Sequence, residues 1–157
     1  MASEERNVLE SRFPENYLEI DFSDLAGARR TALQFSRKHS IDAVLGVDDA
    51  TVAVAAAISE VLGLPSNPVE SVEASRNKRL MREQLQRARV PVPSFKAFEL
   101  REDPARAASK VRYPCVLKPT TLSASQGVIR ADHPQEFIQA WERIARIIRS
   151  VDAPLEI

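Results

Sequence analysis

Apolar and polar side chains in the first half of the chain recur with two different periods. Residues 18–22 switch between apolar and polar at every position, which is typical of a half-buried strand. Residues 24–38 repeat apolar side chains at helical spacing, and the apolar run 43–47 predicts a short buried strand. The alanine-rich segment 51–62 predicts a second helix that ends at Gly63. The first half therefore predicts a strand–helix–strand–helix series.

The second half continues this alternation. The pattern predicts, in order, a helix over 75–89, a strand near 94–99, a helix near 104–110, a strand that ends at Lys118, a strand at 128–130 and a final helix. The final helix has a capping box from Asp132 and Gln135 and an apolar stripe made of Phe137, Trp141, Ile144 and Ile148. Strands that alternate with helices favour the α/β fold class.

A group of turn-forming residues at 65–68 separates the two halves. We therefore predict an irregular N-terminal segment over 1–16, a first unit over 17–74 and a second unit over 75–157. The first unit holds only two predicted strands, and a sheet that small is marginal by itself.

The composition is that of a globular chain with one core or two small ones, since 44% of the 157 residues are apolar and 28% are charged. No run approaches the roughly 18 apolar residues of a membrane span, and the N-terminus lacks the features of a secretory signal. We therefore expect a cytoplasmic protein without a membrane partner. The single cysteine, Cys115, lies in an apolar strand, so we expect it in the core.

The formal net charge of zero hides an uneven distribution. Residues 1–70 contain 6 Lys or Arg and 12 Asp or Glu, whereas residues 71–157 contain 16 and 10. The basic second part favours an anionic ligand. Basic and aromatic residues do not interleave there, and no helix-turn-helix or zinc pattern is present, which argues against nucleic acid as a partner.

The candidate chemistry lies in the second half. Residues 113–118 form an apolar strand that ends in Lys118, and a loop of small residues follows as far as Gly127. Such a loop presents a cation and backbone amides to a phosphate. A second lysine, Lys78, lies at the start of an upstream helix. Either lysine could simply be solvated, but the two settings together predict a nucleotide site.

Four short motifs follow one another around these lysines. They are Asn77-Lys78 at a helix start, Val90-Pro91-Val92-Pro93, Tyr113-Pro114 leading to Lys118-Pro119, and Gly127-Val128. In this order they resemble the ATP-grasp superfamily, and most closely its carbamoyl-phosphate-synthase-like and biotin-carboxylase-like ligases. By this resemblance, residues 17–74 are part of a Rossmann-like pre-ATP-grasp domain. Residues 75–157 are then an incomplete N-terminal α/β subdomain of an ATP-grasp fold, which binds the nucleotide.

The resemblance implies that ATP phosphorylates a carboxylate and that an amine or a thiol then attacks the acyl phosphate. Two lysines would neutralise the phosphates, an apolar strand residue would line the adenine pocket, and the loop would offer amides and hydroxyls to the outer phosphates. These cofactor-binding residues are Lys78, Val116, Lys118, Ser123, Ser125 and Gly127.

The chain also departs from the family pattern. Its loop has Leu122 and Ala124 where the family often has glycine. The second half of the grasp, which carries the Mg²⁺ ligands and the catalytic arginine, has no counterpart in these residues. We therefore expect Mg²⁺ to bind outside this chain, no catalytic residue within it, and at best weak ATP binding by the isolated chain.

Two alternatives stay open at this point. One is a non-catalytic nucleotide-binding or protein-interaction module that uses exposed sheet edges, for which a homodimer is one arrangement. The other is an unrelated α/β anion-binding module. A Rossmann dinucleotide site is excluded, because no Gly-x-Gly-x-x-Gly occurs among the four glycines. The sequence names neither the carboxylate nor the amine.

Overall fold

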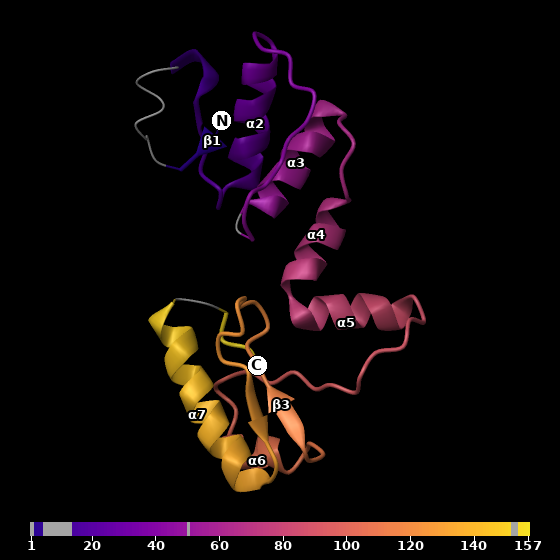
Figure 1. Cartoon of the computed structure of the whole chain (residues 1–157), viewed down its shortest axis with the longest axis vertical. Helices are drawn as coiled ribbons and strands as arrows, with labels where there is room; N and C mark the ends of the chain where they lie inside the picture. The colour runs from indigo at the N-terminus through magenta and orange to yellow at the C-terminus, as the bar shows by residue number, and fades with distance from the viewer. Residues whose placement is uncertain (1, 5–13, 50, 152–153) are drawn as a thin grey trace. The chain divides into compact units, whose positions relative to one another are not determined.

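The structure, a computed structural model, describes residues 2–4, 14–49, 51–151 and 154–157 (Figure 1). It divides into two compact units, Met1–Glu73 and Ala74–Ile157. The boundary falls inside helix α4 (Val69–Arg76). The assignment of the predicted units to family domains stays a prediction.

The first unit contains a parallel pair of two short strands. Strand β1 (Ala2–Ser3) pairs with β2 (Leu18–Glu19), so that Ala2 lies opposite Leu18. A short 3-10 helix, η1 (Pro14–Asn16), precedes β2. The predicted irregular segment over 1–16 therefore contains a short strand at residues 2–3 and a 3-10 helix at residues 14–16. Residues 1 and 5–13 lie outside the described residues. A strand of two residues is too short to show a period, and its partner lies further along the chain.

Two helices complete this unit, α2 (Leu25–Ser36) and α3 (Val52–Leu62). The Asp24 carboxylate accepts a hydrogen bond from the amide of Gly27 and so caps α2. Helix α3 ends at Gly63, whose φ of 68° is the left-handed conformation that favours glycine. Both predicted helices are thus confirmed. Their facing sides share a core made of Ile20, Ala28, Ala32, Val54 and Ile58.

The predicted strand at 43–47 is wrong. No strand is formed there, and the side chains of Leu45 and Val47 are 85% and 92% exposed. A run of apolar residues becomes a strand only when its backbone groups pair with a neighbouring strand. Among the described residues, none pairs with this segment.

The second unit begins with a break between two helices. The pattern predicts one helix over 75–89, but α4 ends at Arg76 and α5 (Lys78–Arg87) starts two residues later. Asn77 lies between them in an extended conformation, and its side chain accepts hydrogen bonds from the amides of Arg79 and Leu80. An Asn cap of this kind starts a new helix. The predicted helix opening at Asn77-Lys78 is confirmed.

The core of the second unit lies between a hairpin and the last helix. Strands β3 (Cys115–Leu117) and β4 (Ile129–Ala131) pair antiparallel, and helix α6 (Pro104–Ala108) packs with them against α7 (Pro134–Ser150). The predicted apolar stripe of α7 is confirmed, because its four members are all buried: Phe137, Trp141, Ile144 and Ile148.

The cap of α7 differs from the predicted one. His133, not Asp132, is the cap residue, and its ring nitrogen Nδ1 accepts a hydrogen bond from the Glu136 amide. The Glu136 carboxylate in turn accepts from the Asp132 amide at 2.7 Å. The arrangement resembles a capping box, but it uses Glu136 instead of Gln135, and Glu136 accepts from the residue before the cap and not from the cap residue itself.

Residues 98–100 pair with the last described residues of the chain. The amides of Phe98 and Ile157 each donate to the other's carbonyl at 3.0 Å, and the Leu100 amide donates to Leu155. A bridge joins Glu99 to Glu156. The predicted strand near 94–99 is therefore wrong for its first part, because the paired backbone begins only at Phe98.

We expect Ile144→Ala to lower the free energy of unfolding of the second unit by about 2–5 kcal/mol, because Ile144 is fully buried in the α7 core. The fluorescence of Trp141, the single tryptophan of the chain, reports this unit during urea unfolding. Ile147→Ala is the matched control on the same helix. Ile147 is only partly buried, so a loss of about 1 kcal/mol is expected, and equal losses in both variants would contradict the described core.

Candidate functional site

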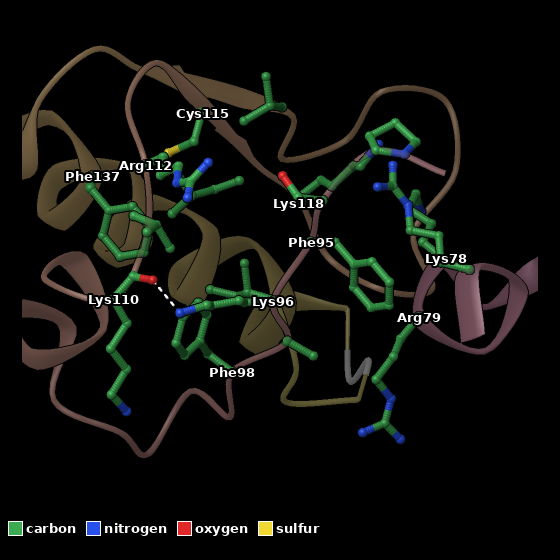
Figure 2. A pocket seen from close by; sticks show the side chains of 18 of the residues that line it. Lys78, Arg79, Phe95, Lys96, Phe98, Lys110, Arg112, Cys115, Lys118 and Phe137 are labelled. Atoms are coloured by element: carbon green, nitrogen blue, oxygen red, sulfur yellow. Dashed lines mark hydrogen bonds between the residues drawn. The ribbon is translucent and has the colours of Figure 1, made fainter. Parts of the chain in front are cut away.

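A pocket of about 890 Å³ lies within the second unit (Figure 2). Its walls come from the start of α5, residues 93–98, residues 110–118 and Arg130. The volume is in the range of pockets that hold cofactors and drug-sized ligands. Among its described lining residues are eight Lys or Arg and no Asp or Glu. Such a wall favours a ligand with several negative charges.

Strand β3 places two of the predicted site residues on one wall. Leu117 is 4% exposed and packs into the core, whereas Val116 is 53% exposed. Because side chains alternate along a strand, Val116 and Lys118 share the face opposite Leu117. Both line the pocket, and Figure 2 shows Lys118 where the strand ends. Their contacts with a nucleotide stay a prediction.

Lys78 lines the pocket from the first turn of α5 and also binds the loop that follows β3. Its ammonium Nζ donates to the Leu122 carbonyl at 2.6 Å and lies 3.5 Å from the Thr120 carbonyl oxygen. Its backbone amide donates to the same Thr120 carbonyl at 2.8 Å. The two predicted lysines therefore meet at one pocket, although they come from distant parts of the sequence.

The loop itself does not line the pocket. Its predicted ligands Ser123, Ser125 and Gly127 are absent from the pocket wall, and both serines are exposed. The amide of Gln126 donates to the Ser123 carbonyl at 3.0 Å, which folds the loop into a turn. Ala124, Ser125 and Gly127 have φ values of 50°, 58° and 72°. Contacts of Ser123, Ser125 and Gly127 with a phosphate stay a prediction.

Thr120 at the base of the loop was not among the predicted site residues. It is 4% exposed and lines the pocket, and its hydroxyl has no hydrogen-bond partner among the described residues. A second missed contact is the ion pair between Arg79 and Glu156, at 2.9 Å. No local pattern predicts it, because the two residues lie at opposite ends of the unit's sequence.

Cys115 is a wall residue as well as a neighbour of the core. It packs against the core, as predicted, but it is only partly buried and also lines the pocket. Burial, and to a lesser degree the negative charge of Asp132, raises the pKa of the Cys115 thiol. The thiol is therefore neutral near pH 7, which agrees with the expectation that no base activates it.

The described residues contain no group of three or more His, Cys, Asp or Glu side chains that could hold a metal ion. The pocket fits a polyphosphate by its charge, but its described walls offer no carboxylate for Mg²⁺. None of the helices in the described part of the chain is long and apolar enough to cross a membrane.

Two family models match this chain. The model of the ATP-grasp N-terminal domain matches residues 2–66, and that of the ATP-grasp domain matches residues 111–156, which contain Lys118 and the loop. The chain belongs to the ATP-grasp superfamily. The predicted family is confirmed, and the alternative of an unrelated anion-binding module is excluded.

Three of the curated relatives that match this chain are named as ligases. The chain is 29% identical over 115 residues to alanine–anticapsin ligase of Bacillus subtilis, and 28% identical over 115 residues to that of Bacillus amyloliquefaciens. Each match covers 73% of this chain and 24% of the relative. The chain thus spans about a quarter of the length of these relatives.

A solved structure supports the fold. The crystal structure of an L-amino acid ligase from Bacillus licheniformis matches with a TM-score of 0.61 and 26% identity. The match covers 82% of this chain and 30% of that structure. The predicted α/β class, part of the N-terminal region of an ATP-grasp fold, is confirmed.

We expect Gly127→Ala to destabilise the second unit by about 2 kcal/mol. Alanine is strained at a φ of 72°, and its Cβ would lie 3.0 Å from ring atoms of Pro119. The matched variant in the same loop is Ala124→Gly, where a φ of 50° already strains the native alanine. Glycine there should stabilise by up to about 1 kcal/mol. Urea unfolding followed by Trp141 fluorescence measures both, and the same sign for both variants would contradict the described loop.

Proposed function

We propose that this chain is the ATP-binding portion of a carboxylate–amine ligase that works through an acyl-phosphate intermediate. The observation that carries the proposal is the pocket itself: Lys118, directly after β3, and Lys78 from α5 line one cavity whose described walls hold no acidic side chain. A triphosphate needs such a wall, because its negative charges must be neutralised when they leave water. The ligase family of the chain agrees with this use.

The six predicted residues take distinct roles in this proposal. Lys118 and Lys78 neutralise the phosphates, and the exposed side chain of Val116 gives the adenine an apolar surface. Ser123, Ser125 and Gly127 reach the outer phosphates only if the loop moves toward the pocket. Bound ATP supplies the phosphoryl group that activates the carboxylate.

We propose amino acids as the substrate class of the whole enzyme. The names of the curated relatives and of the matching structure describe ligases of alanine, anticapsin and L-amino acids. By analogy, the carboxyl group of one amino acid becomes the acyl phosphate, and the amino group of another attacks it with loss of inorganic phosphate. We expect the Mg²⁺ ligands and the catalytic residues outside these 157 residues.

The isolated chain should bind ATP only weakly and should not catalyse. The described pocket provides one cationic wall without metal ligands, so much of the charge of a Mg²⁺–ATP complex stays in contact with water. A dissociation constant on the order of 1 mM corresponds to only about 4 kcal/mol of binding free energy, which such a wall can supply.

The single cysteine offers a direct test of ATP binding, because Cys115 lies in the pocket wall. We expect millimolar ATP to slow the alkylation of Cys115 by iodoacetamide about twofold or more. The reaction is measured at a mildly alkaline pH, since the raised thiol pKa keeps the thiolate scarce near pH 7. Mass spectrometry of the Cys115 peptide gives the rate.

Lys118→Met should abolish this protection, because it removes the cation at the end of β3. Lys38→Met is the matched control, since it removes the same charge from an exposed site in the first unit and should leave protection unchanged. No protection at 10 mM ATP (about ten times the expected dissociation constant) would contradict ATP binding. A stoichiometric complex of the isolated chain with ATP, with a nanomolar dissociation constant, would contradict the proposal that these residues form only part of the ATP site.

A further inference from the structure

The loop at residues 120–127 is bound at its base by residues from two distant parts of the sequence. Lys78 donates to the Leu122 carbonyl through its ammonium, at 2.6 Å, and to the Thr120 carbonyl through its backbone amide, at 2.8 Å. On the other side, the Thr120 amide donates to the Glu156 carbonyl at 3.3 Å. The base of the loop is thus fixed to α5 and to the last residues of the chain.

The conformation of this loop is intrinsically unfavourable. Ala124 and Ser125 both adopt left-handed backbone angles, which cost free energy for residues with a Cβ. The Thr120 hydroxyl is buried without a partner among the described residues, which is a further cost. A strained segment persists only where its surroundings hold it. One such contact in the described structure is the charged hydrogen bond from Lys78, of a kind that is stronger than a bond between neutral groups.

We propose that Lys78 is a positioning residue, which holds the loop at the rim of the pocket and acts on the ligand through the loop as well as through its own charge. The effect of Lys78 on phosphate binding rests on the proposed function, whereas its role in fixing the conformation of the loop does not. A lysine that only supplied charge would have no need to bind the loop carbonyls. Replacing it would then weaken binding without changing the loop.

A second lysine of the pocket provides a matched control. Lys96 also lines the pocket, and its ammonium also donates to a backbone carbonyl, that of Lys110. Figure 2 shows Lys96 and Lys78 on different walls of the pocket. Lys96→Met therefore removes one positive charge and one hydrogen bond of the same kind without touching the loop.

The experiment is hydrogen–deuterium exchange of the ligand-free chain, read on the peptides that cover residues 120–128. The amides of Gln126 and Val128 report the loop, because they donate to the Ser123 and Ser125 carbonyls. We expect Lys78→Met to accelerate their exchange about tenfold, while peptides of β3 and α7 keep their protection. Lys78→Arg should restore most of the protection, since a guanidinium also donates to carbonyls. Lys96→Met should leave the loop unchanged.

Unchanged loop exchange in Lys78→Met, or equal acceleration in Lys96→Met, would overturn the proposal. If the methionine variant does not fold, Lys78→Gln replaces it, because its side chain is too short to reach the Leu122 carbonyl. A second measurement uses inorganic triphosphate as the probe and the alkylation of Cys115 as the readout. Lys78→Met should then lose several-fold more protection than Lys96→Met, and equal losses would overturn the link between loop and ligand.

The two measurements separate this inference from the proposed function. If triphosphate and ATP protect Cys115 in no variant, the nucleotide site is wrong. The difference in loop exchange between the ligand-free wild type and Lys78→Met would still stand in that case. If protection occurs but loop exchange is insensitive to Lys78, the positioning role is wrong and the nucleotide site stands.

Discussion

The packing of α7 on the β3–β4 hairpin is the constraint on which the second unit depends. Its apolar stripe, centred on Trp141 and Ile144, takes Leu117 into the core. Alternation along β3 then leaves Val116 and Lys118 on the opposite face, where they become the pocket wall. The direction of the candidate phosphate-binding lysine is therefore set by a hydrophobic contact on the other side of the strand.

Some of the positive charges of the pocket wall are paired with carboxylates that lie outside the cavity. Arg79 pairs with Glu156 and Lys110 pairs with Glu102, but neither carboxylate lines the cavity. Arg130 likewise pairs with Asp132. The other like charges around the cavity still repel one another, and a bound anion would lower this repulsion. The cationic wall thus favours binding of an anion at some cost to the stability of the free protein.

Local patterns in the sequence predicted those parts of the fold that local interactions determine. The stripe of α7, the glycine end of α3 and the strand that ends in Lys118 all follow from neighbouring residues. Pairings between distant segments were missed, as for β1 with β2 and for Phe98 with Ile157, because a few extended residues have no recognisable period. The helix start at Asn77-Lys78 was predicted, but the separate helix α4 that ends just before it was not. For the site, the two lysines could be predicted from their motifs, whereas Thr120 and its contact with Lys78 depend on tertiary structure.

The segment at 43–47, which forms no strand, has a consequence for the behaviour of this protein in solution. Leu45 and Val47 expose almost their whole apolar side chains on a backbone that has no strand partner among the described residues. Exposed apolar residues whose backbone has no strand partner are sites where edge-to-edge aggregation can begin. A lysine in place of Val47 would act as a gatekeeper against such association at little cost to the core.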